Sequence, residues 1–228
     1  YKLRLMLGKK LINSGPTSSG ANTFASENFN TVLYTGTGAA QKIGGYINRG
    51  AVFNGSSSFV GIPSSVIDPS NVYSVSMWVN FTNASTYTGI FCNNTSAFRV
   101  GEISIMKPNA NSLQIFSGGQ AGTNLLDAIT ATPSSSFVSN TWYHIVVISD
   151  RSISNQRAKV YVNGSEASYS SYAANNASVS TYTTTRIGNA DNQFLNGRID
   201  DVRIYSDELT STEVGYIYNN TTASIPTD

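Results

Sequence analysis

The feature that most constrains this chain is a series of short strand patterns. It starts near Phe29 and recurs roughly every eight to twelve residues, with turn residues between the patterns. Only 12% of the 228 residues are charged, whereas Gly, Tyr and runs of Ser, Thr and Asn are prominent. This composition favours short strands joined by polar turns over helices. We therefore expect an all-β fold, and a single large β-sandwich accommodates a chain of this length.

Two strand patterns indicate where the core lies. The segment from Tyr73 to Phe81 alternates, which predicts one face toward the core and Trp78 on the opposite face. The segment from Trp142 to Ile148 is apolar on both faces. A strand of that kind belongs in the middle of a sheet that is covered on both sides.

Turn residues predict three hairpins. The dipeptides Asn54-Gly55 and Asn163-Gly164 favour the positive φ angles of tight hairpin turns, and a third hairpin is expected across Pro108. The strands are expected at residues 31–34, 51–53, 58–62, 103–106, 113–116, 159–162, 186–188, 194–195 and 198–205.

One helix is predicted near the C-terminus. Thr210 and Glu213 have the spacing of a capping box, in which the two residues satisfy each other's free backbone amides. Val214, Ile217 and Tyr218 would then form the apolar side of the helix.

The two ends of the chain differ from the region between them. Residues 1–25 are expected to form an N-terminal arm or linker, residues 26–222 the folded domain and residues 223–228 a tail. The basic and apolar stretch from Lys2 to Lys10 is an edge strand or a connector, and a small membrane anchor is the alternative. No apolar run approaches the ~20 residues of a membrane span. Cys92 is the single cysteine, so no disulfide can form within the chain.

Four segments follow one another in a recognisable order. They are AVFNGSSSFV from Ala51, YSVSMWV from Tyr73, WYHIVV from Trp142 with VYVNG from Val160, and NGRIDDVRIY from Asn196. In this order they resemble landmarks of the laminin-G-like domains of the concanavalin-A-like lectin and glucanase superfamily. The resemblance covers about residues 45 to 220 and implies two antiparallel sheets packed as a jelly-roll sandwich.

The residues argue against catalysis. Glycosidases use two carboxylates about 5–9.5 Å apart, and on one strand such a pair needs acids at alternate positions. Asp200 and Asp201 are adjacent, so they point to opposite faces of a regular strand. His144 is the only histidine, which excludes multi-histidine metal centres. We interpret His144 as a satisfied buried imidazole and Cys92 as a buried, inert thiol.

Asp200 is the most informative charged residue. On a regular strand it shares a face with Val202 and Ile204, and a carboxylate that faces a core needs partners. One hypothesis is that it caps backbone amides or pairs with Arg203 or Arg186. The other, which the resemblance implies, is a structural Ca²⁺ site with oxygen ligands from Asp200, Asn54 and Asp68.

Two polar loops contain residues of the kind that bind sugars, which present an apolar face and a rim of hydroxyls. In the first loop, tyrosines flank Asn175 and Asn176; the second runs from Asn189 to Gln193. The alternative is that the tyrosines cover sheet edges and the asparagines form turns. The candidate ligand-binding residues are Tyr169, Tyr172, Tyr182, Asn189, Asp191 and Asn192.

A formal charge of +1 provides no long-range attraction to nucleic acid. From the resemblance we expect a non-catalytic adhesion or recognition module, extracellular or on a virion surface, whose partner is a glycan or glycoprotein on a cell surface. The segment from Phe29 to Ile43 resembles virion and tail-appendage proteins of bacterial viruses. The alternative is a structural decoration or fibre subunit that contacts itself or a scaffold through the arm containing Leu3, Leu5 and Leu7.

Overall fold

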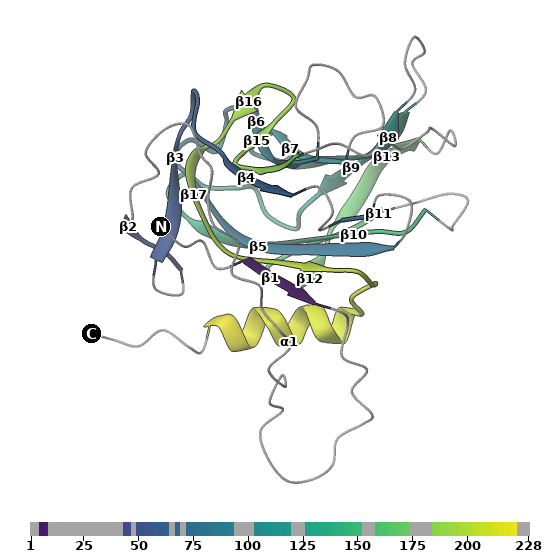
Figure 1. Cartoon of the computed structure of the whole chain (residues 1–228). Coiled ribbons are helices and arrows are strands. Elements are labelled where there is room, and N and C mark those ends of the chain that lie inside the picture. Colours follow the sequence, from purple (N-terminus) through teal and green to yellow (C-terminus); the bar gives the residue numbers. More distant parts are fainter. Residues whose placement is uncertain are drawn as a thin grey trace, which may run out of the picture.

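The computed structural model describes residues 5–8, 43–46, 49–63, 67–68, 72–93, 103–119, 126–151, 158–173 and 184–222. Two β-sheets lie face to face, and helix α1 (Ser211–Thr222) lies on the outer side of one of them (Figure 1). The expected strand at residues 31–34, the residues Leu3 and Tyr182 and the tail at 223–228 lie outside the described residues.

Sheet A, which carries α1, has the strand order β12-β11-β10-β5-β17-β3-β2, with β1 beside β17. Neighbouring strands are antiparallel, except that β1 runs parallel to β17. The stretch interpreted as an edge strand or a connector therefore contributes a strand. The strands are β1 (Leu5–Gly8), β2 (Ile43–Gly44), β3 (Arg49–Asn54), β5 (Tyr73–Phe81), β10 (Trp142–Ser149), β11 (Ala158–Val162), β12 (Ser165–Glu166) and β17 (Asn196–Tyr205).

Sheet B is antiparallel and has the order β13-β9-β8-β7-β6-β14-β4. A separate two-stranded hairpin, β15 (Asn189–Ala190) and β16 (Gln193–Phe194), lies on its outer side. The strands are β4 (Val60–Pro63), β6 (Thr88–Cys92), β7 (Ser104–Asn109), β8 (Ser112–Gly119), β9 (Leu126–Thr132), β13 (Ser168–Ala173) and β14 (Thr184–Ile187).

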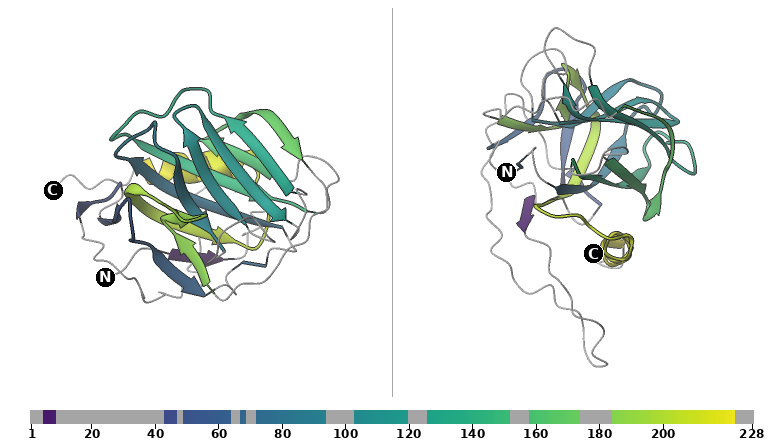
Figure 2. Two further views of the ribbon diagram at one scale, coloured as in Figure 1. Left: turned by 90° about the horizontal axis from the view of Figure 1, so that it is seen from above. Right: turned by 90° about the vertical axis from the view of Figure 1, so that its right-hand side faces the viewer.

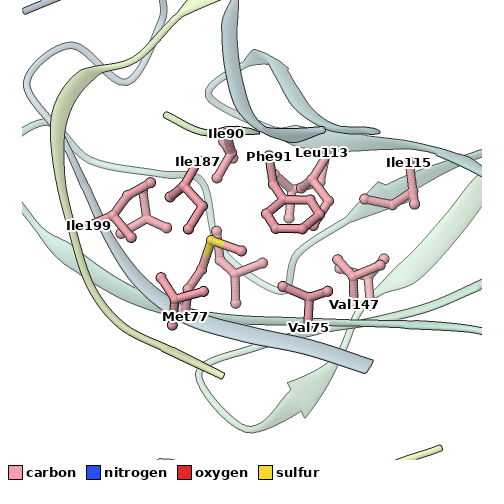
Figure 3. Packing of buried hydrophobic residues seen from close by; sticks show 14 of the residues in the cluster. Val75, Met77, Ile90, Phe91, Leu113, Ile115, Val147, Ile187 and Ile199 are labelled. Carbon is pink, nitrogen blue, oxygen red and sulfur yellow. The ribbon is translucent and has the colours of Figure 1, made fainter. Parts of the chain in front are cut away.

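The core fills the space between the two sheets (Figure 3). Val75 and Met77 of sheet A face Phe91 and Leu113 of sheet B, and all four are essentially inaccessible to water. Burying each such side chain contributes ~1.5–3 kcal/mol. Because the described residues contain no disulfide, this packing holds the two sheets together.

Several local predictions are confirmed. Strands β7 and β8 form the hairpin expected across Pro108, and β11 and β12 pair across Asn163 and Gly164, whose φ angles are 51° and 78°. The capping box is also present. The Thr210 backbone N–H donates to Glu213 Oε2 at 2.7 Å, and the Glu213 N–H donates to Thr210 Oγ1 at 3.3 Å.

The hairpin predicted at Asn54-Gly55 is wrong. Strand β3 lies in sheet A and β4 in sheet B, so the turn carries the chain from one sheet to the other. Asn54 Oδ1 accepts backbone N–H groups of Ser56, Ser57 and Ser58 at 2.9–3.1 Å, which curls the chain instead of pairing its two arms.

The predicted orientation of Asp200 is also wrong. A β-bulge follows Asp200, and Asp201 has a φ of 48°. The inserted residue shifts the alternation, so Val202 and Ile204 lie in the core while Asp200 pairs with Trp78 on the outer face. Asp200 therefore lies under the helix side of sheet A.

The outer face of sheet A is partly closed by α1. The helix packs Val214 and Ile217 on Val146 and Ile148 of β10, which confirms that β10 is covered on both sides. Trp78 points outward as predicted but is only 2% exposed. The ring of Tyr46 stacks on it with a centroid distance of 3.5 Å, and Tyr218 of α1 stacks at 5.8 Å.

Candidate functional site

The β15–β16 hairpin crosses the outer face of sheet B directly over β6 (Figure 2, left). The crossing is possible because β6 has Gly89 at the contact. A Cβ atom at this position would lie 2.2 Å from the backbone N of Ala190 and 2.5 Å from the carbonyl O of Gln193. Beneath and beside the hairpin, Cys92 and Met106 are fully buried. The predicted burial of the Cys92 thiol is confirmed.

The hairpin presents polar groups at its tip. Asp191 and Asn192 have φ angles of 49° and 57°, as a two-residue turn requires. Asn192 is exposed and Asp191 half-buried. Asn189 has a different role, because it is 1% exposed and its Nδ2 donates to the Gln193 carbonyl at 3.0 Å. Two of the three predicted residues in this loop are therefore accessible, and the third holds the hairpin in shape.

Arg186 of β14 lies at the base of the hairpin. Its guanidinium lies 4.4 Å from the centre of the Phe59 ring, and Nη1 donates to Asn189 Oδ1 at 3.2 Å. The Nε donor has no hydrogen-bond partner among the described residues, nor does the half-buried side chain have a carboxylate partner there. Sequence reasoning treated Arg186 only as a partner for Asp200. The Arg186–Cys92 pairing places it on the outer face of sheet B instead.

This site, which comprises Arg186, Phe59, Asn189, Asp191 and Asn192, combines three kinds of group. A fixed cation supplies several N–H donors, a carboxylate and a carboxamide supply acceptors, and an aromatic ring lines the base. A ligand with many hydroxyl groups matches such a mixture of donors and acceptors. We refer to these residues as the hairpin site.

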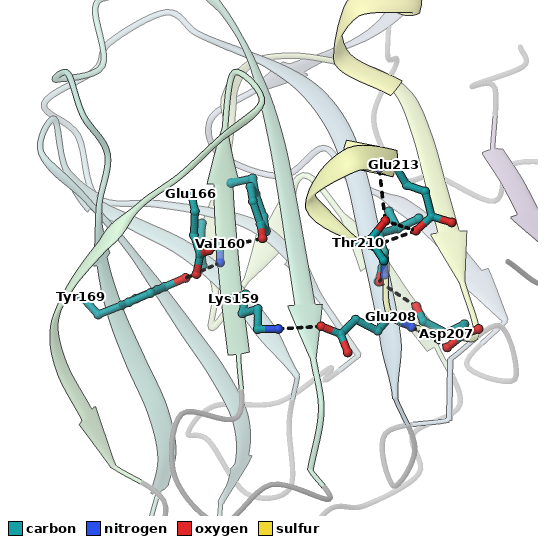
Figure 4. A network of polar contacts seen from close by, with 11 residues as sticks. Lys159, Val160, Glu166, Tyr169, Asp207, Glu208, Thr210 and Glu213 are labelled. Atoms are coloured by element: carbon teal, nitrogen blue, oxygen red, sulfur yellow. Dashed lines mark hydrogen bonds and ion pairs between the residues drawn. The ribbon is translucent and has the colours of Figure 1, made fainter. Parts of the chain in front are cut away.

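The tyrosines of the first predicted loop lie elsewhere. Tyr169 belongs to a polar network (Figure 4): its hydroxyl donates to Glu166 Oε1 at 2.8 Å and accepts the Val160 N–H at 3.1 Å. Tyr172, in contrast, is 59% exposed. Both lie on edge strand β13, four interstrand spacings or about 19 Å from β6. The two predicted loops therefore do not form one site, and Tyr182, Asn175 and Asn176 lie outside the described residues.

The residues proposed for Ca²⁺ are dispersed. Asn54 pairs with Asn196, and Asp200 lies four residues further along β17, about 13 Å away. Asn54 Oδ1 already accepts backbone N–H groups of its own turn. Asp68 is exposed and is separated from the strands by unassigned residues. In the described part of the chain, no three His, Cys, Asp or Glu side chains are grouped closely enough to hold a metal ion.

Asp200 and its neighbours instead form polar contacts on the outer face of sheet A. Asp200 Oδ1 accepts the Asp201 N–H at 2.8 Å, which is the backbone cap that the sequence suggested. Arg203 forms its ion pair with Asp201 at 2.7 Å and not with Asp200. The Asp201 carboxylate is 1% exposed in its side chain, so this ion pair is largely buried.

Ser76 and His144 also lie on this outer face, next to the Arg203 ion pair. Ser76 Oγ lies 2.9 Å from His144 Nε2, whereas Nδ1 has no partner in the described structure. The imidazole is therefore buried as predicted, but only one of its two ring nitrogens has a hydrogen-bond partner among the described residues. Burial, followed by the charge of Arg203, lowers the pKa of His144 to about 3. Both side chains are 1% exposed, so a substrate cannot reach this Ser–His pair.

Taken together, the fold defines a two-sheet antiparallel sandwich of the lectin-like class, with one short helix after its last strand. A family profile described as concanavalin A-like lectin/glucanases superfamily, Laminin_G_3, matches residues 54–215. The chain belongs to this family. No curated protein sequence matches it significantly.

Solved structures share the fold at low sequence identity. Domain 4 of AbnA, an extracellular GH43 arabinanase from Geobacillus stearothermophilus solved with arabinotriose, has 22% identity and a TM-score of 0.54, over 85% of this chain and 91% of that domain. The binding domain of botulinum neurotoxin DC in complex with SialylT has 16% identity and a TM-score of 0.60, over 84% of this chain. This chain spans 47% of that binding domain. At such identities the likeness shows the fold alone.

Nowhere in the described residues is a helix both long and apolar enough to cross a bilayer.

Proposed function

We propose that this domain is a non-catalytic recognition module that binds a glycan, or the glycan of a glycoprotein, at the hairpin site. The observation that carries the proposal is the fixed position of the Arg186 guanidinium at the base of the hairpin. Its guanidinium is held by Phe59 and Asn189, is half-buried, and has no carboxylate partner among the described residues. Of its five N–H donors, only the one that points to Asn189 has a partner in the described structure. Sugar hydroxyls supply acceptors for the donors at the accessible end.

The solved structures that share the fold support this proposal. The arabinanase domain was solved with arabinotriose, and one botulinum neurotoxin domain was solved with SialylT. Both share the sandwich of this chain. The arabinanase is extracellular, which supports a location outside the cell, and display on a virus particle is one form of that proposal.

The absence of catalysis is part of the proposal. Asp201 is fixed by the Arg203 ion pair and Asp200 is 3% exposed. Neither carboxylate is available to protonate a glycosidic oxygen. Hydrolysis would need two accessible carboxylates on opposite sides of the bond.

A glycan array probed with the purified protein, with Ca²⁺ and with EDTA, tests the proposal. Specific binding should appear, and Arg186→Gln should weaken it at least tenfold while Val138→Ala, a change of a 58% exposed apolar residue outside the hairpin site, leaves it unchanged. Loss of binding in EDTA would require a metal site formed by residues other than the dispersed Asn54, Asp68 and Asp200. Binding that survives Arg186→Gln would remove the hairpin site from the proposal, and no binding by the folded protein would reject glycan recognition.

One observation favours the alternative of a structural, self-assembling subunit. Strand β1 comes from the N-terminal arm and pairs in parallel with β17, and its other edge pairs with no strand among the described residues. An open edge can accept a strand of another molecule. Sedimentation equilibrium over a range of concentrations would distinguish the two: a concentration-dependent oligomer supports assembly, and a monomer throughout argues against it.

A further inference from the structure

A second group of side chains lies on the outer face of sheet A. Three neighbouring strands place Trp142, Asn80 and Arg198 next to one another, because Trp142 pairs with Asn80 and Asn80 pairs with Arg198. The residues that follow Trp142 and Asn80, Tyr143 and Phe81, lie in the core. The three side chains therefore point to the opposite, outer face. We name them the sheet A strip.

These three side chains have no polar partner among the described residues. No hydrogen bond or ion pair joins the side chain of Trp142, Asn80 or Arg198 to another described residue. Asn80 is only 7% exposed, whereas Trp142 and Arg198 on either side are half-buried. A buried carboxamide normally has a hydrogen-bond partner. Because the Asn80 carboxamide has no partner among the described residues, it can offer a donor and an acceptor to a bound molecule.

The neighbouring polar groups on this face are already engaged, which makes the strip distinct. In the adjoining rows, His144 contacts Ser76, and Arg203 pairs with Asp201. Asp200, two residues beyond Arg198, is 3% exposed and accepts a backbone N–H. The accessible charge of the strip is therefore the cation of Arg198.

An aromatic ring borders the strip at one end. Trp142 meets the edge of Tyr46 at a centroid distance of 6.0 Å and an interplanar angle of 63°. Tyr46 is itself fixed by stacking on Trp78. The indole of Trp142 is thus oriented by a rigid neighbour but remains partly accessible to a ligand.

We propose that the sheet A strip is a second carbohydrate-binding site, selective for a sugar that carries a carboxylate, such as a uronic or sialic acid. The Trp142 indole offers an apolar face to the sugar ring, Asn80 offers a donor and an acceptor to hydroxyls, and Arg198 binds the carboxylate in its fork of N–H donors. The three residues span two interstrand spacings, about 10 Å, which suits one or two sugar rings. The strip is separate from the hairpin site, so either assignment can fail alone.

Titration of the full chain with 3′-sialyllactose and with lactose, and with digalacturonic acid and its neutral counterpart, tests the proposal by calorimetry. Tryptophan fluorescence gives a second readout, because Trp142 is half-buried whereas Trp78 is 2% exposed. At least one acidic sugar should bind tenfold or more tightly than its neutral partner and change the emission. Equal affinity for both members of each pair, or no binding, would overturn the proposal.

Variants then assign the binding to the strip. Arg198→Gln should lower the affinity for the acidic sugar to that for the neutral one, Trp142→Phe should keep weakened binding, and Asn80→Ala should weaken it about tenfold. Val138→Ala is the control for an exposed apolar side chain elsewhere. If Arg198→Gln keeps full affinity while Arg186→Gln loses it, the acidic sugar binds at the hairpin site, which overturns this inference and leaves the proposed function intact. Far-UV circular dichroism and the Arg198→Lys variant, which should retain part of the selectivity, exclude misfolding as the cause.

Discussion

The two outer faces of the sandwich are covered in different ways. On sheet A, helix α1 packs apolar side chains on β10 and leaves a buried Arg203–Asp201 ion pair and a half-satisfied His144 nearby. On sheet B, a two-stranded hairpin passes over Gly89, which has no side chain to obstruct it, and covers small or apolar side chains such as Cys92 and Met106. The stability of the first face therefore depends on the ion pair, and the stability of the second depends on the close contact between the backbones of the hairpin and β6.

This difference predicts how each face fails. Loss of the ion pair or a change of pH on sheet A should lower the free energy of unfolding. On sheet B, the same loss is expected when a larger side chain is added under the hairpin. Arg186 lies at the base of the hairpin that covers sheet B and donates to Asn189 of that hairpin. On sheet A, Asn80 and Arg198 lie in a different row of residue pairs from Ser76 and Arg203. On sheet B the cover therefore fixes the position of a residue that remains partly accessible.

The largest effect is expected from Arg203→Met. The change leaves the Asp201 carboxylate buried without its cation, which should lower the free energy of unfolding by about 3–5 kcal/mol. Urea denaturation measures it. The double variant Asp201→Asn/Arg203→Met removes the orphaned charge and should recover part of the loss. If the double variant is no more stable than the single one, the ion pair is not the feature that matters on this face.

Gly89→Val should have the next largest effect, about 2–3 kcal/mol, because its side chain would collide with backbone atoms of Ala190 and Gln193. The displaced hairpin should also uncover Cys92, which is 0% exposed in the structure. Reaction with a thiol reagent under native conditions should accelerate in the variant. A thiol as unreactive as that of the unchanged protein would show that the hairpin is not what covers it.

The pH dependence of stability tests sheet A separately. The pKa of His144 is about 3 in the folded state against an ordinary value of 6.5, so between these values the unfolded state binds more protons. The free energy of unfolding should therefore fall as the pH drops from 6.5 toward 3, by at most about 1.4 kcal/mol per pH unit. His144→Gln should flatten this slope. An equally steep slope in the variant would assign the acid sensitivity to other groups.

The smallest effect is expected in α1 itself. A Cβ added at Gly215 meets nothing within 4 Å, so Gly215→Ala should stabilise the helix by about 0.5–1 kcal/mol. Thermal unfolding should shift upward by roughly 1–4 °C. A downward shift would mean that the helix surface packs against something beyond the described residues.

Local signals allowed much of the fold to be predicted. The Asn163-Gly164 turn and the Thr210–Glu213 capping box depend on neighbouring residues alone, and both are present. The sheet that a strand joins does not depend on neighbouring residues alone. Asn54-Gly55 indicates a reversal of the chain, but the contacts of β3 with β17 and of β4 with β14 decide that the two arms enter different sheets.

The candidate sites were harder to predict than the fold. The bulge at Asp201 reverses the face of Asp200, and alternation in a sequence does not reveal an inserted residue. The adjacent aspartates were the one signal, since Asp tolerates a positive φ better than most residues. The sheet A strip depends on the register of three strands far apart in the sequence, so no local pattern brings its residues together.

The position of β17 has a consequence for how the molecule reaches its native state. This strand is formed by residues 196–205, yet it pairs with β1, β3 and β5, which lie between residues 5 and 81 and are synthesised much earlier. Sheet A therefore stays open until residues 196–205 have left the ribosome. Contacts between such distant segments slow folding. Until β17 pairs with them, the unpaired edges of β3 and β5 make the nascent chain prone to aggregation. Production of this domain should thus depend more on chaperone capacity and growth temperature than its size suggests.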